Sequence, residues 1–254
     1  MPSLKKTVLL VALCFAAPAL ASLGVRAASS QPSSWRTADW SSSGILLAAG
    51  EDRRAAVYVM AARTGGLKGA LAVHSWIVTK DAGAKSYTRY EKVAWGYPIR
   101  TNDYPADGRW YSNDPEILLA LHGNEAARLI PRIEKAIRAY PYANRGDYTI
   151  WPGPNSNSFI AHVLRAVPEL GLTLPPEAVG RDYRPFGDFV TLSPDKRDLE
   201  LSLGGYAGLA VGRLHGFEIR LGGLVFGVDI ANPGIKLPGF GRVGVSGNPV
   251  IAPE

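Results

Sequence analysis

Residues 69–78 read Gly69-Ala70-Leu71-Ala72-Val73-His74-Ser75-Trp76-Ile77-Val78, and their alternation is typical of a β-strand. In such a strand Ser75 and Ile77 would lie on one face of the sheet, whereas His74 and Trp76 would lie on the other. A strand with two unlike faces is characteristic of an antiparallel sheet, because each face can meet a different environment. The stretch therefore predicts an antiparallel sheet with His74 on one of its central strands.

Three other segments are expected to be strands. Residues 55–61 and 87–95 are rich in β-branched and aromatic side chains, and a short strand is expected over 148–151. The chain has 28 glycines and 19 prolines in 254 residues, a high proportion that favours short strands and turns over a helical bundle.

Two helices are expected to pack on this sheet. Asp114-Pro115 places an N-cap residue before a proline at the first helical position, and an apolar stripe follows, so a helix is predicted over 115–140. A second helix is predicted over 157–167, where Pro168 ends it. The predicted fold class is therefore α+β, with the domain spanning residues 51–190.

The C-terminal part of the chain has a different pattern of apolar residues and glycines. Strands of alternating or continuous apolar residues are expected over 199–203, 217–221 and 224–230, and paired glycines separate them. Residues 191–254 are therefore predicted to form a Gly-rich β extension of the same domain.

The N-terminus resembles an export signal. Lys5 and Lys6 precede the apolar run Val8–Ala17, and Ala19-Leu20-Ala21 supplies small residues for cleavage after Ala21. Cleavage after Ala27-Ala28 is one alternative, and retention of the segment as an uncleaved membrane anchor is another. Residues 1–21 are thus predicted to be a signal peptide and the protein to be periplasmic.

After cleavage, residues 22–50 are expected to be a flexible linker, since they are rich in Ser and Ala. The mature chain would lack Cys14, which is the single cysteine, and this suits an oxidising compartment. It would carry no further transmembrane helix. Its net charge would fall from +6 to +4, because Lys5 and Lys6 are removed.

Several function classes lack their sequence signatures. No run of basic residues interleaved with aromatics occurs, so no nucleic-acid partner is expected. No Cys or His cluster has metal-ligand spacing, and no phosphate or dinucleotide loop is present, so we expect no metal and no cofactor. A component of the cell envelope, such as peptidoglycan, a lipid or a lipoprotein, is the expected partner.

Two residues are candidates for chemistry. Ser156 would begin a helix, where unpaired N–H groups and the helix dipole stabilise an anion, although Asn155, Ser156 or Asn157 could instead cap the helix. His74 lies in mid-strand, which would hold a general base rigidly, but a histidine bonded within the core is the alternative.

Three stretches resemble a bacterial envelope family, the domain of unknown function numbered 3750. They are Ala72–Val78, Asp107–Asn113 and Trp151–Phe159, and the last of them is the most specific. The resemblance covers residues 50–245, but the family name implies no activity.

A more distant resemblance does imply an activity. In circularly permuted papain-like proteins, of the NlpC and lecithin–retinol acyltransferase type, a strand histidine precedes an Asn-Cys-x-x-Phe segment that opens a helix. The segment from Asn155 to Phe159 has that form with Ser156 in the cysteine position, and His74 matches the strand histidine. The resemblance implies that Ser156 attacks, that His74 removes its proton, and that Glu91 or Arg89 orients His74.

Three functions remain open at this point. The first is a serine-dependent hydrolase or acyltransferase acting on an amide or ester of the envelope, with Ser156 partly open to solvent beside His74. The second is a non-catalytic envelope binding module of the same fold, and the third is a structural or assembly protein. In either of the first two, the expected substrate-binding residues are Trp76, Trp110, Tyr111, Trp151, Asn155 and Asn157.

Overall fold

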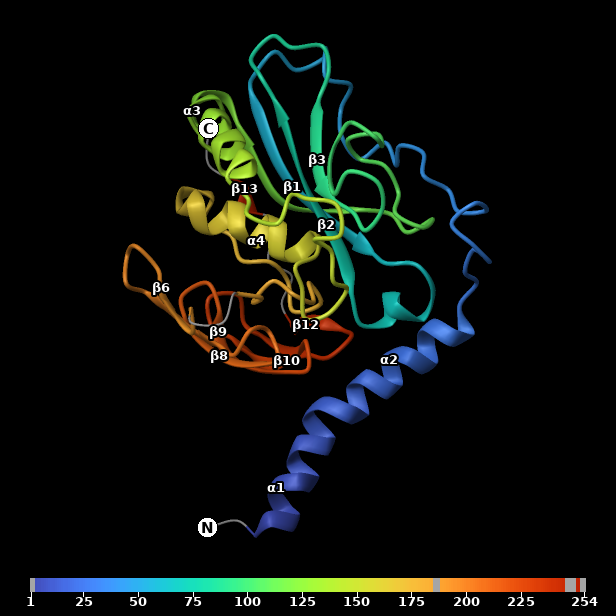
Figure 1. Ribbon diagram of the computed structural model, residues 1–254, viewed down its shortest axis with the longest axis vertical. Helices are drawn as coiled ribbons and strands as arrows, with labels where there is room; N and C mark the ends of the chain where they lie inside the picture. Colours follow the sequence, from blue (N-terminus) through green and yellow to red (C-terminus); the bar gives the residue numbers. More distant parts are fainter. Residues whose placement is uncertain (1–2, 185–187, 245–249, 252–254) are drawn as a thin grey trace.

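The computed structural model describes residues 3–184, 188–244 and 250–251 (Figure 1). Two β-sheets form the body of the protein, and a long helix projects from it at the N-terminus. The last parts of the predicted C-terminal extension, residues 245–249 and 252–254, lie outside the described residues.

The first sheet confirms the predicted fold class, since all of its strand pairs but one are antiparallel. Its strand order is β13-β5-β1-β2-β3-β4, so β2, which carries His74, is an interior strand as predicted. The strands are β1 (Ala56–Arg63), β2 (Val73–Lys80), β3 (Thr88–Lys92), β4 (Ile99–Thr101), β5 (Glu116–His122) and β13 (Val250–Ile251).

Helices α3 (Gly123–Arg138) and α4 (Ser156–Ala166) cover one face of this sheet, as predicted. Alternate residues of β1 and β2, such as Val59 and Ile77, are buried against the helices. The opposite face carries a second core of Trp76, Met60 and Trp110, which loops cover. Strands β1 and β2 therefore have two buried faces.

The predicted helix over 115–140 begins too early, because residues 116–122 form β5. The apolar run from Ile117 to Leu121 occupies the position beside β1, where two buried faces favour a continuous apolar strand. Gly123 then takes a positive φ of 68° and starts α3.

The predicted strand over 148–151 is also wrong. The N–H of Thr149 donates to the carbonyl of Pro154 within the same loop, so the segment finds its partner locally instead of in a sheet.

The second sheet is an antiparallel meander in the order β12-β11-β10-β9-β8-β7-β6, and it confirms the strands predicted near 199–203, 217–221 and 224–230. Figure 1 shows α4 lying between this sheet and the first one. Its strands are β6 (Val190–Leu192), β7 (Asp198–Ser202), β8 (Ala207–Gly212), β9 (Gly216–Leu221), β10 (Leu224–Asp229), β11 (Gly234–Leu237) and β12 (Gly241–Gly244).

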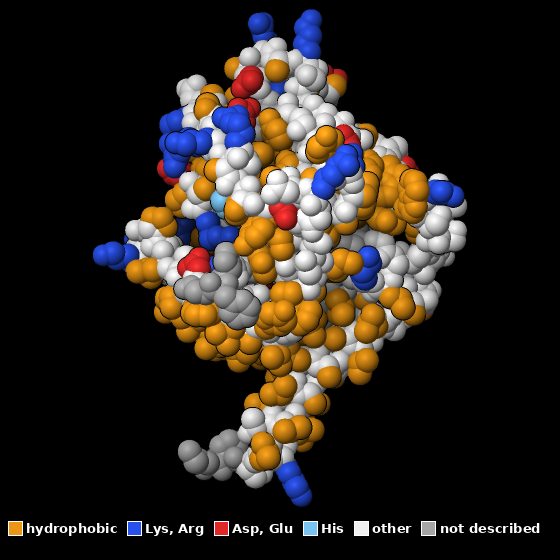
Figure 2. Space-filling model, viewed as in Figure 1, with side chains coloured by type: hydrophobic (Ala, Val, Ile, Leu, Met, Phe, Trp, Pro, Cys, Tyr) orange, Lys and Arg blue, Asp and Glu red, His pale blue; other side chains and the backbone are white. Residues whose placement is uncertain are grey.

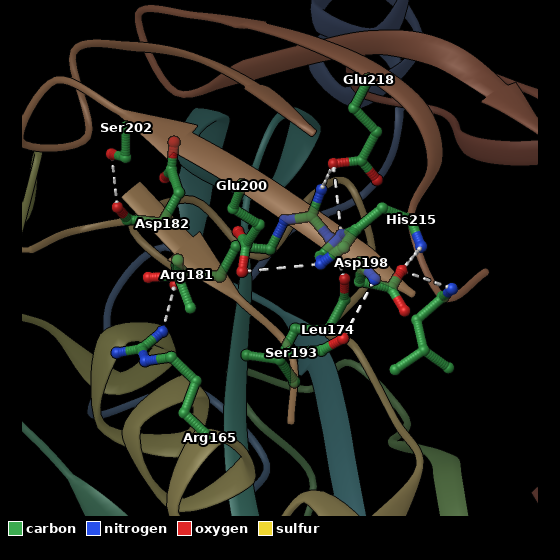
Figure 3. Close-up of polar contacts among 12 residues, drawn as sticks. Arg165, Leu174, Arg181, Asp182, Ser193, Asp198, Glu200, Ser202, His215 and Glu218 are labelled. Carbon is green, nitrogen blue, oxygen red and sulfur yellow. Dashed lines mark hydrogen bonds and ion pairs between the residues drawn. The ribbon is translucent and has the colours of Figure 1, made fainter. Parts of the chain in front are cut away.

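The face of the second sheet that looks toward α4 is charged (Figure 3). Glu218, fully buried on β9, accepts hydrogen bonds of 2.6 Å from both Arg181 and Lys236. Arg220 bridges Glu218 to Glu200 on β7. Burial alone would raise the pKa values of both carboxylates. The bond from His215 and the charge of Arg220 hold the pKa of Glu200 far below its usual range, and the three cations around Glu218 do the same there. Both carboxylate oxygens of Glu218 therefore have a cationic partner, as a buried charge requires.

The N-terminal helix runs without a break through α1 (Leu4–Val11), a π-helical segment η1 (Ala12–Ala16) and α2 (Ala17–Ala28). It has 25 residues, and its most apolar 18-residue stretch has a mean hydropathy of 2.4, so it is long and apolar enough to cross a membrane. An apolar helix in this place is compatible with a signal sequence. The helix continues past Ala21, and Ser22 donates to the carbonyl of Ala70 in the short 3-10 helix η2 (Gly66–Ala70).

Helix α4 is attached to the first sheet by its N-terminal residues. The Asn155 side chain caps the helix by accepting from the N–H groups of Asn157 and Ser158. The buried side chain of Asn157 accepts from Ser75 at 2.8 Å and donates to the carbonyls of Val73 and Val179, each at 2.9 Å. Asn157 thus joins α4, β2 and the chain that leads to the second sheet.

We predict that Asn157→Ala lowers the free energy of unfolding by about 3 kcal/mol, because it removes three hydrogen bonds and leaves the buried hydroxyl of Ser75 without its acceptor. Chemical unfolding followed by circular dichroism measures the change. Asn124→Ala, at an exposed position of α3, is the matched control and should stay near the wild type. A loss at position 157 as small as that of the control would contradict this role.

Candidate functional site

A cleft of about 300 Å³ opens where the N-terminus of α4 meets the first residues of β2. The loop that precedes α4 forms one wall, through Tyr148, Ile150 and Trp151. A loop of the aromatic core forms another through Trp110 and Tyr111, and Leu224 of the second sheet closes one side. The cleft brings together segments that are far apart in the sequence.

Ser156 lines the cleft as the first residue of α4, and Asn155 rather than Ser156 is the helix cap. Ser156 is buried, with 4% of its surface exposed, so the expectation that it is partly open to solvent is wrong. The amide and hydroxyl of Ser156 both face the hydroxyl of Tyr148. Burial raises the pKa of Tyr148, and the interactions with Ser156 offset part of this rise. The phenol oxygen therefore stands at the helix N-terminus, where an anionic oxygen would be stabilised.

His74 also lines the cleft and is paired with Glu91 on the neighbouring strand β3. The distance from His74 Nε2 to Glu91 Oε2 is 2.7 Å, and Arg89 donates to the same oxygen at 2.9 Å. The bond from His74 and the charge of Arg89 hold the pKa of Glu91 below its usual range, despite its burial. Burial lowers the pKa of His74, an effect larger than the opposing bond to Glu91. Because an ionised Glu91 can only accept, Nε2 carries the proton and Nδ1 is the basic nitrogen.

The pairing of Ser156 with His74 is less direct than the papain-like resemblance implies. Ser75 faces α4 and bonds to Asn157, so strand alternation turns His74 toward the opposite face of the sheet. The two residues reach the same cleft beside the first residues of β2, because β3 pairs with β2 only from Ile77 onward. His74 is hydrogen-bonded to Glu91, and Ser156 faces the hydroxyl of Tyr148.

The expected binding residues fall into two groups. Trp76 is fully buried beneath the guanidinium of Arg89, and Trp110 is buried against the His74 ring, with the ring centroids 3.7 Å apart. Tyr111 and Trp151 line the cleft, and 42% of the Trp151 surface is exposed.

Asn155 and Asn157 line the cleft as well, but their side chains are used in holding α4. Asn155 also donates to the carbonyls of Ile150 and Val179, so its amide holds the wall of the cleft in place. Both residues therefore fix the shape of the cleft through these hydrogen bonds.

Lys68, Trp95 and Tyr148 are among the cleft residues that the sequence analysis missed. Lys68 and Trp95 are exposed, and no motif in the sequence marks them. Tyr148 was expected in a strand, and only the loop path reveals that its hydroxyl reaches Ser156.

Within the described residues, no three His, Cys, Asp or Glu side chains are arranged to hold a metal ion. The expectation that the protein uses no cofactor stays a prediction.

Together the fold and the cleft define an α+β protein with a buried His–Glu pair beside a helix N-terminus. The family model described as "Protein of unknown function (DUF3750)" matches residues 54–183, and the chain belongs to this family. The matched range contains His74, Glu91 and Ser156. No curated protein and no solved structure matches the chain. The papain-like resemblance has no support from these comparisons.

The lowered pKa of His74 predicts a pH dependence of stability. The unfolded chain, with a histidine pKa of about 6.5, binds this proton more readily than the folded protein does. The free energy of unfolding should therefore fall as the pH is lowered from 7 to 5, by at most about 1.4 kcal/mol per pH unit for this group.

His74→Gln should lose this part of the pH dependence, because glutamine does not titrate and can still donate to Glu91. Urea unfolding of both proteins at pH 7, 6 and 5 measures it. Carboxylates such as Glu91 titrate only at lower pH and do not interfere. Equal slopes in the two proteins would show that folding does not shift the pKa of His74.

Proposed function

We propose that the protein is exported to the cell envelope and binds an acylated envelope component in the cleft at the N-terminus of α4. The observation that carries this proposal is the composition of the cleft. Trp95 and Trp151 offer half-exposed rings, Ile150 adds an exposed apolar side chain, and Leu71 and Leu224 extend the apolar wall. Such a wall suits an acyl chain, since apolar burial is the main source of affinity in small-molecule sites.

The polar groups of the cleft favour an anionic or carbonyl head group on this ligand. Lys68 is a cation on the lining, and the described lining contains no carboxylate. The N–H of Ser156 at the start of α4 adds a donor with a favourable dipole. A head group that displaced the Tyr148 hydroxyl would take over this donor.

A serine-dependent hydrolysis or acyl transfer is the second candidate, and the His74–Glu91 pair supports it. In this reaction His74 Nδ1 would take the proton from Ser156, whose hydroxyl attacks the carbonyl of an ester or amide. Glu91 would stabilise the resulting imidazolium, and the amide of Ser156 would donate to the oxyanion. The reaction requires Ser156 to turn from Tyr148 toward His74, and for this reason we rank binding first.

We predict that a fatty acid bearing an environment-sensitive fluorophore binds the protein and that Trp151→Ala weakens this binding roughly tenfold, equivalent to about 1.4 kcal/mol. The fluorescence of the probe measures the affinity. Trp35→Ala removes an exposed tryptophan outside the cleft and should leave the affinity unchanged. Failure of the probe to bind, or equal weakening by both variants, would contradict an acyl site in the cleft.

For the catalytic candidate, we predict that Ser156→Ala and His74→Gln each abolish nearly all hydrolysis of a p-nitrophenyl ester, because residues that act as a unit are not additive. Ser156→Cys should retain part of the activity, since a thiol is the more easily ionised nucleophile. Release of p-nitrophenol measures the rate. A wild-type rate equal to that of Ser156→Ala would reject catalysis and leave the binding proposal standing.

A further inference from the structure

The second sheet has its apolar side turned away from the protein. On β7, β8 and β9 the charged or small residues face α4, whereas the alternate positions Leu201, Leu209 and Ile219 face outward. An antiparallel sheet with one face in water normally shows the reverse pattern, apolar toward the body and polar toward water. The inversion suggests that the outward face does not meet water.

The outward side chains form two continuous cross-strand rows, which we call the outer apolar face. Register places Leu199 opposite Val211, and Leu201 opposite Leu209. The rows continue through the other strands of the meander. Eleven of their residues are between 36% and 58% exposed: Val190, Leu192, Leu199, Leu201, Leu209, Val211, Phe217, Ile219, Val228, Ile235 and Val243. A contiguous apolar surface of this kind marks a contact with a partner or a membrane.

The N-terminal helix identifies the lipid bilayer as the occupant. Helix and sheet touch where Phe15 meets Phe226, with ring centroids 6.0 Å apart. Figure 1 shows the free end of the helix projecting on the side of the molecule where the second sheet lies, and Figure 2 shows hydrophobic side chains gathered over both. The helix is about 37 Å long by its rise per residue, and its first residues, 4–14, precede the contact at Phe15. They amount to about 16 Å, about half of a hydrocarbon core of about 30 Å. A helix that enters the bilayer would therefore bring the outer apolar face against it.

The space between helix and sheet supports the same occupant. A cavity of about 670 Å³ separates Leu10 and Cys14 of the helix from Leu203, Leu209 and Leu221 of the sheet. Arg220 contributes there, but its charged end pairs with Glu200 and Glu218 on the other side. A cavity with apolar walls on two sides fits acyl chains.

The margin of the face carries groups suited to lipid head groups. Lys196, Arg197 and Arg213 are exposed in the β6–β7 and β8–β9 turns, which lie at one end of the meander, with Asp195 as an exposed acidic neighbour. An excess of cations at the edge of an apolar surface favours anionic lipids.

We propose that the outer apolar face of the second sheet lies on a lipid bilayer that contains anionic lipids. The proposal concerns a surface and not a reaction, and it stands independently of the acyl site in the cleft. It applies to the chain with its N-terminal helix, and the sheet would keep the same apolar face if residues 1–21 were removed.

The test uses the full chain with Cys14→Ser, reconstituted into vesicles of phosphatidylethanolamine and phosphatidylglycerol. A fluorophore is attached at Leu209→Cys or Val211→Cys, and at Ser86→Cys as the control in the exposed β2–β3 turn. The N-terminal helix is the same in all three proteins, so differences report the position of the sheet alone. Mass spectrometry verifies that the helix is intact.

Doxyl groups on the lipid acyl chains should quench the label at positions 209 and 211 strongly and the label at position 86 hardly at all. Aqueous iodide should give the opposite order. Quenching by iodide at positions 209 and 211 equal to that at position 86 would overturn the proposal. Protection from iodide without quenching by doxyl lipid would also overturn it, because a second copy or another protein would then cover the face.

Binding of the fluorescent fatty acid separates this proposal from the acyl site. Val211→Ser alters the outer apolar face outside the cavity beside the helix and should leave binding in the cleft unchanged, whereas Trp151→Ala should weaken binding without changing the doxyl quenching. Each proposal can thus fail without the other.

Discussion

The side chain of Asn157 is the interaction on which the arrangement of the molecule depends. It connects α4 to two points of β2 and to Val179, from which the chain continues toward the second sheet. Because all of its polar groups are buried and paired, no other position of the helix satisfies them equally well. The cleft is a consequence of this attachment, since Ser156 precedes Asn157 by one residue and must lie beside the start of β2. Any chemistry at Ser156 therefore depends on a residue whose own role is structural.

The second constraint is the burial of charge beneath the second sheet. Glu218 lies within hydrogen-bond distance of three cations, and its free energy of burial is offset only while all of them remain. Such a network contributes less to stability than an apolar core of the same size, but it fixes which face of the sheet turns inward. The charged face pairs with Arg181 and Arg184 from the chain after α4, and these contacts hold the charged face inward and the apolar face outward.

Local patterns predicted much of this fold. The alternation around His74, the caps before α4 and the Gly-separated strands after residue 198 depend on neighbours in sequence, and they gave the α+β class with an antiparallel sheet. The helix expected from residue 115 failed because Pro115 at a first helical position and an apolar run fit a helix and a buried strand equally well. The segment forms a strand because it pairs with the edge of β1 that β2 leaves open, and this pairing depends on the whole sheet and not on local sequence.

The candidate site was likewise predicted in part from the sequence, and the rest depends on the whole fold. The sequence pointed to His74, Glu91 and Ser156 as one group, and the fold does bring His74 and Ser156 to one cleft and Glu91 to His74. It could not indicate that Ser75 would take the face toward α4, or that Tyr148 would occupy the helix N-terminus, because both depend on where β3 stops and how the loop before α4 is folded.

The cleft and the outer apolar face meet at neighbouring residues of β9 and β10, so the two proposed sites lie next to each other. Leu224 on β10 lines the cleft and is paired across the sheet with Leu221, which lines the cavity beneath the N-terminal helix. On the cleft wall, Trp151 stacks edge-on against Tyr206 in the turn between β7 and β8, at 5.0 Å between ring centroids. An acyl chain leaving a bilayer at this edge would pass from Leu221 to Leu224 and on to Trp151 without crossing a buried charge. If both proposals hold, the acyl ligand would enter the cleft from the membrane side of the molecule.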